Sequence, residues 1–559
     1  MSGAAPAEER LTLGRYAGDL ADRFGEAPAA VYHGERISFV ELERRTRATA
    51  RALVAAGVVK GTRVGVLMGN RPEFVTTVFA VGMAGGVAVP VSTFATPAER
   101  DQIIRHSDMA MLVLQDRLAG HRYVDELATG HPELTGTPGS LRSTSFPFLR
   151  RVVSLSEGGP FEDWDDFVAG GASVHDALLE AADAEIVPYD DAVVIYTSGT
   201  TAEPKGVVHT HRSVTGQLWR WGDQLKLTPD DRVWSAFPLF WVAGFATFLG
   251  GTLSAGACMV LQDGFDPAET LELLEHERVT TIHAFPNANA QLAAHPDATR
   301  RDLSSLRNVT ADSALSDLLG LSGREGSWDM AAGYGSSETF SVSTALPMDL
   351  PLAVRRSSHG VALPGMSVRV VDVDDGRPLP PGESGEITVK GVYLMRTYHK
   401  MAPERCLDDA GWFHTGDAGH LDEEGHLHWH GRISRMIKTG GCNVAPVEVE
   451  AQALRSGMLS LACVVGLPHP TLGEAVVLAG VARDPAVTAE GLVEHLRTVL
   501  SSYKIPRRVL LFEPGQLHLT DNDKVRADEV RRLAVERLAE SEEDEAWRSL
   551  LAQLGEVRA

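Results

Sequence analysis

The sequence predicts an α/β protein with a large N-terminal domain of α/β sheets, a β-rich subdomain and a small α+β C-terminal domain. Short apolar runs typical of buried strands alternate with amphipathic helical stretches through most of the chain. This alternation indicates βα units with largely parallel strands. Because 559 residues are too many for one hydrophobic core, we expect more than one domain.

The N-terminal elements follow from apolar runs and their spacing. Strands are expected in RVGVLMG (63–69), VAVPV (87–91), AMLVLQ (110–115) and AVVIYTSG (192–199). A helix is expected in PEFVTTVFAVGMAG (72–85). Short, almost wholly apolar strands suit a sheet that helices cover on both faces.

The pattern changes after about residue 360. Residues 366–391 resemble a hairpin-rich β segment. From about residue 433 a shorter α+β pattern begins, with a strand at 460–468 and a helix around 489–501. We therefore place a boundary near Gly431–Ser434 and expect domains at 1–431 and 432–534. The stretch from about 527 is charged and helix-prone, and we expect a helical tail at 535–559.

One uncharged stretch, residues 233–262, is long enough to suggest a membrane span. Pro238 and several glycines interrupt it, which suits a helix, a glycine-rich turn and a buried strand better than one continuous helix. We therefore expect no membrane span.

The composition excludes some classes of function. The net charge of −23 disfavours binding to nucleic acid or an anionic membrane surface, so an anionic substrate must be held by local positive groups. The four cysteines form no CxxC pair, and the N-terminus MSGAAPAEER lacks an apolar signal core. These features predict a reduced, cytoplasmic protein without a zinc site.

The strongest local signal is YTSGTTAEPKG, from Tyr196 to Gly206, between a predicted strand and a predicted helix. Its hydroxyl and glycine residues can surround an anion with N–H and O–H donors, and Lys205 adds a mobile positive charge. A plain surface turn is the alternative. The segment lacks the GxxxxGK[ST] pattern of a Walker A loop.

This segment resembles the signature loop of the ANL superfamily, which contains acyl-CoA synthetases, peptide-synthetase adenylation domains and luciferases. The resemblance covers nearly the whole chain, because GNRPEFV, VAVPV, GYGSSET, HTGD and GRISRMIKTGG follow in the family's order. It implies an AMP-forming acid–thiol ligase that uses ATP, Mg²⁺ and coenzyme A, with a hinged C-terminal domain. The partners implied are a carboxylic acid or its acyl-adenylate, and coenzyme A.

The resemblance also implies roles for individual residues. Glu338 would hold Mg²⁺, for which an oxygen ligand is suited, although a solvated surface glutamate is the alternative. Lys524 would bridge the substrate carboxylate and the α-phosphate, unless it is a plain solvated lysine. The nucleotide would be bound by Thr197, Ser198, Gly199, Thr200, Thr201, Ser313, Gly333, Tyr334, Gly335, Ser336, Ser337, Asp417 and Arg432.

Within that set, Asp417 would accept hydrogen bonds from the ribose hydroxyls, and Arg432 would contact ribose or phosphate unless it forms only a structural ion pair. For the thioester step, Gly440, Gly441 and Asn443 would line the pantetheine channel, with Ser434 at the hinge. These glycines could otherwise form only a tight turn. Cys442 has no accompanying base motif and is read as a bystander.

The acid pocket is expected around FPLFWVAGF, residues 237–245. The stretch from Val233 to Gln262 contains no Asp or Glu to pair with a substrate ammonium, which disfavours a free α-amino acid. Phe240, Trp241 and Phe245 would form an apolar wall, with Gly333 beside it, and this predicts a bulky apolar acid. Core packing is the alternative role for these aromatic residues.

Four positions depart from the family pattern: Ala202, Asp312, Ser434 and Asp523. Three of these concern nucleotide handling, which raises the hypothesis that the chain adenylates poorly and works mainly on an adenylate from a partner enzyme. Loading a carrier protein and binding an adenylate without catalysis are further alternatives.

Overall fold

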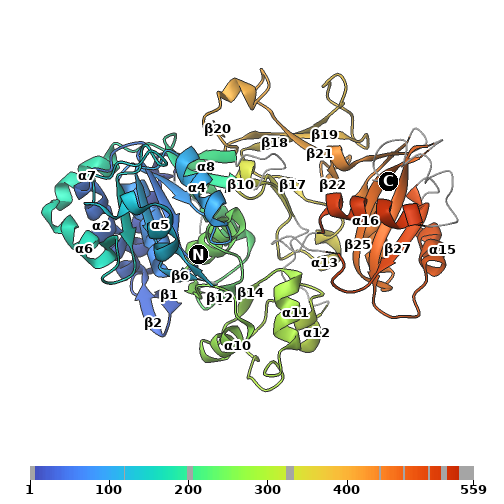
Figure 1. Ribbon diagram of the computed structural model, residues 1–559, viewed down its shortest axis with the longest axis horizontal. Coiled ribbons are helices and arrows are strands. Elements are labelled where there is room, and N and C mark those ends of the chain that lie inside the picture. Colours follow the sequence, from blue (N-terminus) through green and yellow to red (C-terminus); the bar gives the residue numbers. More distant parts are fainter. Residues whose placement is uncertain are drawn as a thin grey trace. The chain divides into compact units, whose positions relative to one another are not determined.

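The computed structural model describes residues 7–118, 120–197, 205–322, 333–439, 442–469, 472–500, 504–517 and 525–540 (Figure 1). The chain divides into two compact units, of which the first comprises residues 1–368 and 389–413 and the second comprises residues 369–388 and 414–559. The expected boundary near Gly431–Ser434 lies within the second unit, so a separate domain at residues 432–534 stays a prediction.

The central sheet of the first unit has eight strands. Their order is β20 (Thr397–Tyr398), β11 (Lys205–Thr210), β10 (Asp191–Thr197), β4 (Val87–Pro90), β3 (Arg63–Leu67), β5 (Met111–Leu114), β8 (Arg151–Ser154) and β9 (Glu162–Asp163). The strands from β10 to β9 pair in parallel, whereas β11 and β20 add an antiparallel edge. The strands predicted from apolar runs are therefore confirmed.

Successive side chains of a strand point to opposite faces of the sheet, and both faces of this sheet are apolar and covered by helices. In β5, Met111 and Val113 belong to one core and Leu112 and Leu114 to another. The first core includes side chains of α1 (Leu13–Phe24), α2 (Phe39–Ala55), α3 (Pro72–Met83) and α8 (His211–Gln224). The second includes side chains of α4 (Pro97–His106) and α5 (Tyr123–Gly130).

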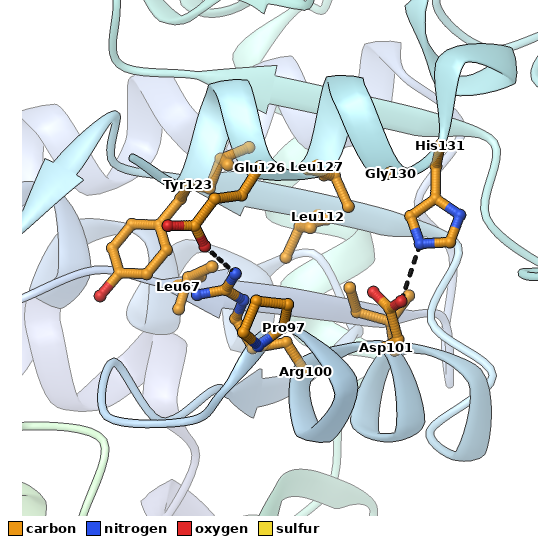
Figure 2. Close-up of a pocket in the computed structure, with 12 residues that line it drawn as sticks. Leu67, Pro97, Arg100, Asp101, Leu112, Tyr123, Glu126, Leu127, Gly130 and His131 are labelled. Carbon is orange, nitrogen blue, oxygen red and sulfur yellow. Dashed lines mark hydrogen bonds and ion pairs between the residues drawn. The ribbon is translucent and has the colours of Figure 1, made fainter. Parts of the chain in front are cut away.

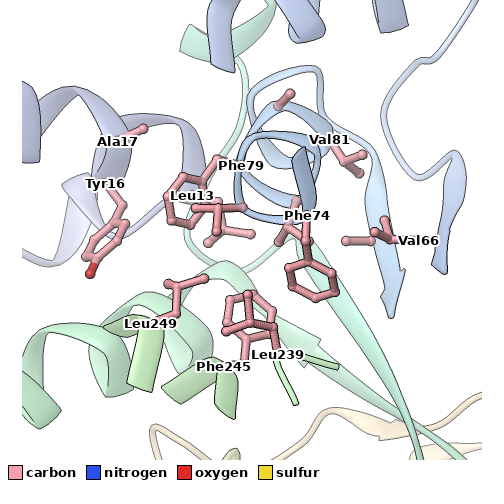
Figure 3. Close-up of a cluster of buried hydrophobic side chains, with 14 of the residues drawn as sticks. Leu13, Tyr16, Ala17, Val66, Phe74, Phe79, Val81, Leu239, Phe245 and Leu249 are labelled. Carbon is pink, nitrogen blue, oxygen red and sulfur yellow. The ribbon is translucent and has the colours of Figure 1, made fainter. Parts of the chain in front are cut away.

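A second sheet in this unit has five strands. Their order is β14 (Thr281–His283), β12 (Arg232–Ser235), β13 (Cys258–Val260), β1 (Pro28–Tyr32) and β2 (Glu35–Ser38). The uncharged stretch contains the end of β12, a π-helix at Ala243–Gly250, α9 (Gly251–Ser254) and β13. Figure 3 shows Phe245 and Leu249 from this stretch packed near Phe74 and Phe79 of α3. Within the described ranges, no helix is long and apolar enough to cross a membrane.

Shorter elements complete the first unit. The helices are α6 (Trp164–Gly170), α7 (Asp176–Ala184), α10 (Pro267–His276), α11 (Pro286–Ala294), α12 (Ala314–Leu318) and α13 (Leu352–Arg355). The strands are β6 (Arg117–Leu118), β7 (His121–Arg122), β15 (Gly333–Tyr334), β16 (Thr344–Ala345) and β17 (Val361–Ala362). Short 3₁₀ turns occur at Glu8–Arg10, Pro132–Thr135, Gly171–Ser173, Ser337–Thr339 and Pro403–Arg405.

The predicted hairpin-rich segment forms part of a four-stranded sheet. Its order is β18 (Met366–Val371), β19 (Gly385–Gly391), β21 (Phe413–Leu421) and β22 (Leu427–Arg432). A 3₁₀ turn, Ile433–Arg435, follows β22.

The last sheet of the chain lies in the second unit. Its strands are β24 (Cys442–Val444), β23 (Ile437–Thr439), β26 (Gly473–Ala482) and β25 (Leu459–His469), with β27 (Arg508–Phe512) parallel to β26. Helices α14 (Pro446–Arg455) and α15 (Ala489–Val499) contribute to one core and α16 (Ala527–Glu540) to another. The predicted strand at 460–468 and helix at 489–501 are confirmed.

Candidate active site

The predicted phosphate loop is the segment from Tyr196 to Gly206, which spans the end of strand β10 and the start of the antiparallel strand β11. Thr197 ends β10 directly opposite Lys205, which begins β11. Residues 198–204 between them lie outside the described residues, and so do the predicted contacts of Ser198, Gly199, Thr200 and Thr201. The two described ends, Thr197 and Lys205, are therefore paired with each other in the sheet.

Glu338 lies in a 3₁₀ turn, Ser337–Thr339, whose backbone is held from several directions. The Ser336 hydroxyl caps the turn by accepting from the Glu338 N–H at 3.2 Å. The Met395 N–H donates to the Glu338 carbonyl at 2.7 Å, and Nε2 of His209 donates to the Ser337 carbonyl at 2.7 Å. Burial lowers the pKa of His209 to about 4, so its ring is neutral near pH 7 and keeps this donor.

The Glu338 carboxylate has its own partner in Tyr398 on strand β20. The tyrosine hydroxyl donates to Oε1 of Glu338 at 2.7 Å. Nζ of Lys205 lies 5.4 Å from the centroid of the same tyrosine ring, within the range of a cation–π contact. Pairing of β20 with β11 sets Tyr398 opposite Val207, two residues after the lysine. Tyr398, which the sequence interpretation missed, thus contacts two of the predicted catalytic residues.

The backbone around the predicted nucleotide segment is tight and strained. A Cβ atom on Gly335 would lie 1.8 Å from the Ser341 carbonyl oxygen, so only glycine fits there. Phe340 and Ser341 have φ angles of 43° and 106°, which are unusual for residues with side chains. Tyr334 is buried beside them. Such strain is maintained only where surrounding contacts fix the backbone, and it is frequent at functional sites.

Asp312 is one of the four departures from the family pattern, and Ser313, a predicted nucleotide-binding residue, follows it. Ser313 is buried and caps α12, because its hydroxyl accepts from the Ser316 N–H at 3.2 Å. Asp312 has a φ of 51°, a left-handed conformation that aspartate tolerates better than most residues, and it pairs with Arg356. Asp312 therefore fits the local backbone.

In the second unit, Asp417 and Arg432 lie opposite each other on strands β21 and β22. Nε of Arg432 is 3.1 Å from Oδ1 of the buried Asp417, and Nη1 of Arg432 donates to the Thr415 carbonyl at 2.7 Å. The structural ion pair considered from sequence is present. The same pair can also offer a carboxylate and a guanidinium to a nucleotide, so the binding role stays a prediction.

Aromatic side chains from separated segments gather around Trp241. Its ring centroid is 5.7 Å from that of Phe240, 5.6 Å from Phe94 and 6.0 Å from Phe285. Phe94 is 45% exposed, although it is apolar. Sequence analysis did not identify Phe94 and Phe285, because they lie in loops outside the segment FPLFWVAGF. Phe245, by contrast, is fully buried against Phe74 and Phe340, and its part in the pocket stays a prediction.

A small cavity of about 60 Å³ lies between helices α4 and α5 and the central sheet. Its floor includes Leu67 and Leu112 (Figure 2). Arg100 pairs with Glu126 at one end of the cavity, and Asp101 pairs with His131 at 2.8 Å at the other.

Several predicted site residues cannot be placed. Lys524, Gly440 and Gly441 lie outside the described residues, and so do the side chains of Ser434 and Asn443. Gly333 pairs with Ala345 through β15 and β16, and a Cβ there would lie 2.9 Å from the Thr344 carbonyl oxygen. These roles therefore stay predictions.

The residues at hand fit a Mg²⁺ ion bound together with substrate phosphates. In the part of the chain that the structure describes, no group of three or more His, Cys, Asp or Glu side chains could hold a metal ion. Magnesium, however, is usually held by only one or two carboxylates, substrate phosphates and water. The half-buried carboxylate of Glu338 is a suitable oxygen donor of this kind.

The two-part α/β fold with these motifs is that of the adenylate-forming enzymes. Residues 19–399 match the AMP-binding enzyme family, and residues 448–524 match the AMP-binding enzyme C-terminal domain. The chain therefore belongs to the AMP-binding enzyme family, within the ANL superfamily that its motifs indicated.

Individual relatives and solved structures agree with this assignment. Feruloyl-CoA synthase of Amycolatopsis sp is 32% identical over 512 residues, covering 90% of this chain and 96% of the relative. Indoleacetate–CoA ligase of Aromatoleum aromaticum is 31% identical over 508 residues, covering 90% and 94%. ATP-bound MatB from Rhodopseudomonas palustris is similar in structure, with a TM-score of 0.74, 26% identity and coverage of 93% and 99%.

The chain is therefore an adenylate-forming CoA ligase, an AMP-forming acid–thiol ligase that uses ATP, Mg²⁺ and coenzyme A. The predicted class of enzyme and its cofactors are confirmed.

Proposed function

We propose that this ligase converts a bulky apolar carboxylic acid into its coenzyme A thioester through an acyl-adenylate. The observation that carries the proposal is the aromatic cluster of Phe94, Phe240, Trp241 and Phe285. The segment from Val233 to Gln262 supplies no carboxylate to this cluster. Apolar rings favour apolar substrate groups, and a substrate ammonium there would lose its hydration without gaining a partner.

The names of two relatives support a ring-bearing apolar acid. One is a feruloyl-CoA synthase and the other an indoleacetate–CoA ligase. Both names denote acids whose carboxyl group is joined to an aromatic ring through a short carbon chain. An aromatic-walled pocket offers edge-to-face contacts to such rings, and aromatic pairs contribute about 0.5–1.5 kcal/mol beyond area burial.

The reaction proceeds in two steps under this proposal. A carboxylate oxygen attacks the α-phosphorus of ATP, and the bond to pyrophosphate breaks. The sulfur of coenzyme A then attacks the acyl carbonyl, and AMP leaves with the oxygen that joined it to the acid. Because the first step brings two anions together, positive groups must offset their repulsion.

Residues of this chain would supply that compensation. Lys205 would contact phosphate, and Lys524 would bridge the carboxylate and the α-phosphate. Mg²⁺, held by Glu338, would neutralise phosphate charge when bound. We propose that the ribose is bound by Asp417 and Arg432, and the rest of the nucleotide by Thr197, Ser198, Gly199, Thr200, Thr201, Ser313, Gly333, Tyr334, Gly335, Ser336 and Ser337.

For the second step, we propose that residues 432–534 form a domain that turns about Ser434. This motion would bring Gly440, Gly441 and Asn443 beside the pantetheine arm. Glycine backbone without side chains lets a narrow arm pass closely.

A matched pair of acids tests the proposal. 3-Phenylpropanoic acid and L-phenylalanine share one carbon skeleton and differ only in the α-ammonium group. With ATP, Mg²⁺ and coenzyme A, we expect mass spectrometry to detect the thioester of the first acid. We expect phenylalanine to react at least about 100-fold more slowly, since an unpaired buried charge costs several kcal/mol.

Acetate serves as the small-acid control in the same assay. We expect it to react more slowly than the aryl acid, because it cannot fill the aromatic cluster. Preference for phenylalanine or for acetate over every bulky apolar acid would overturn the proposed substrate class. Adding preformed acyl-adenylate in parallel shows whether the adenylation step limits the rate.

A further inference from the structure

The exposed Phe94 belongs to a short loop, residues 92–96, between strand β4 and helix α4. The loop is the only connection between these two elements, so its backbone decides where the Phe94 ring lies against Trp241. At its end, Thr96 caps α4 by accepting from the Glu99 N–H, and the Glu99 carboxylate accepts from the Thr96 N–H at 2.8 Å. The capping box fixes the exit of the loop but leaves Thr93 to Ala95 to other contacts.

Tyr123 holds the residue before Phe94. Its hydroxyl donates to the Thr93 carbonyl at 2.8 Å, and its ring is 1% exposed in the core beneath α4 and α5. Burial raises the pKa of Tyr123 to about 12, with Arg100 opposing the shift, so the hydroxyl keeps its proton at any ordinary pH. The hydrogen bond therefore always has its donor.

Arg100 holds the residue after Phe94. Its Nη1 donates to the Ala95 carbonyl at 3.4 Å, and its guanidinium lies 4.9 Å from the centroid of the Tyr123 ring. Glu126 pairs with the same guanidinium, and the arginine is only 6% exposed. Figure 2 shows Tyr123, Arg100 and Glu126 together at one end of the small cavity. Tyr123 and Arg100 thus donate hydrogen bonds to the backbone carbonyls on either side of Phe94.

We propose that Tyr123 and Arg100 are positioning residues that fix the Phe94 loop from behind and thereby set which acids the aromatic pocket accepts. This inference rests on the proposed function, because it takes Phe94 as part of the acid pocket. Neither residue belongs to the aromatic cluster of Phe94, Phe240, Trp241 and Phe285. Each acts through a loop carbonyl, so its loss should widen the range of Phe94 positions rather than remove a substrate contact.

The main test is Tyr123→Phe, which removes only the hydroxyl. We expect KM for 3-phenylpropanoic acid to rise about three- to tenfold, the loss typical of one hydrogen bond, while KM for ATP stays within about twofold. Arg100→Lys, which keeps a charge for Glu126 but loses the planar fork, should act in the same direction. An unchanged KM for the acid in both variants would overturn the inference.

Asp101→Asn is the matched control. Asp101 lines the same cavity but pairs with His131. We expect this variant to keep the wild-type KM for the acid. An equal rise in KM for the acid and for ATP in Tyr123→Phe would indicate general loosening and would also overturn the inference.

Amide hydrogen exchange separates this inference from the proposed function. Residues 92–96 should exchange about three- to tenfold faster in Tyr123→Phe than in the wild type or Asp101→Asn, whatever the acid is. If the wild type forms no thioester from any bulky apolar acid, the proposed substrate class fails. Unchanged exchange in Tyr123→Phe refutes the positioning role by itself.

Discussion

The hydroxyl of Tyr398 donates a 2.7 Å hydrogen bond to Oε1 of Glu338, although the two residues are 60 positions apart in the chain. The contact exists because β20 pairs with β11 at the edge of the central sheet, beside the turn that carries Glu338. Lys205 lies over the same tyrosine ring. The Tyr398 side chain therefore contacts both Lys205, in the predicted phosphate loop, and Glu338, the predicted magnesium ligand.

Tyr398→Phe should weaken the binding of Mg²⁺ with ATP. The ring that faces Lys205 remains, but the carboxylate loses the donor that orients it. Hydrogen bonds to charged groups contribute about 1.5–3 kcal/mol, so we expect the Mg²⁺ concentration for half-maximal pyrophosphate exchange to rise about tenfold or more. Tyr393→Phe is the control, because Tyr393 accepts from Arg220 instead. An unchanged magnesium requirement in Tyr398→Phe would show that the contact does not orient Glu338.

Trp241→Ala and Phe245→Ala should separate pocket from core. Trp241 is partly exposed, whereas Phe245 is 0% exposed in the main core. We expect Trp241→Ala to lower kcat/KM for 3-phenylpropanoic acid about 10- to 100-fold with little loss of stability. Phe245→Ala should lower the free energy of unfolding by about 3–5 kcal/mol. Urea unfolding and initial rates measure both, and the reverse pattern would exchange the roles of the two residues.

Gly335→Ala should disrupt the turn that carries Glu338. The added methyl group would lie 1.8 Å from a backbone oxygen, which no side-chain movement can relieve. We expect adenylation activity to fall by more than about 100-fold, because small displacements of positioned groups are costly. Gly18→Ala is the control, since a Cβ in that helix meets nothing within 4 Å. Near-normal activity of Gly335→Ala would contradict the described geometry.

Stability should fall as the pH is lowered from about 6.5 to about 4. Burial lowers the pKa of both His209 and His211 to about 4 from the ordinary value of 6.5. Between those values the unfolded chain binds protons that the folded chain excludes, so stability is complete above about 6.5 and is lost on acidification. Each histidine accounts for on the order of 3 kcal/mol of this loss in the free energy of unfolding.

Replacing one of these histidines isolates its share of the pH dependence. His209→Gln keeps an N–H donor for the Ser337 carbonyl but cannot titrate. We expect the free energy of unfolding, measured in urea from pH 7.5 to 5, to fall less steeply in the variant than in the wild type. Identical slopes would show that His209 is not a buried neutral group.

Sequence patterns predicted the fold well because they report local periodicity. Strands β3, β4, β5 and β10 and helix α3 are short apolar or amphipathic runs, and such runs indicate a strand or a helix by their own periodicity. The motif residues Thr197, Lys205 and Glu338 were named because YTSGTTAEPKG and GYGSSET resemble motifs of the ANL superfamily, and their roles stay predictions. Asp312 departs from the family pattern, yet aspartate tolerates its positive φ better than most residues do.

Contacts between distant segments could not be predicted in the same way. Tyr398 reaches Glu338 only through the pairing of β20 with β11, and Phe94 reaches Trp241 only through packing of a loop. Neither residue carries a periodic or motif signal of its own. Phe245 carries a motif signal but is buried in the core. An aromatic run in a sequence does not reveal which ring is buried and which lines a pocket.

The most direct test of the central claim follows the oxygen atoms of the acid. The wild-type enzyme is given 3-phenylpropanoic acid labelled with oxygen-18 in both carboxyl positions, together with ATP, Mg²⁺ and coenzyme A. An acyl-adenylate intermediate predicts one labelled oxygen in AMP and one in the thioester. Formation of thioester with unlabelled AMP, or with ADP in place of AMP, would contradict the account.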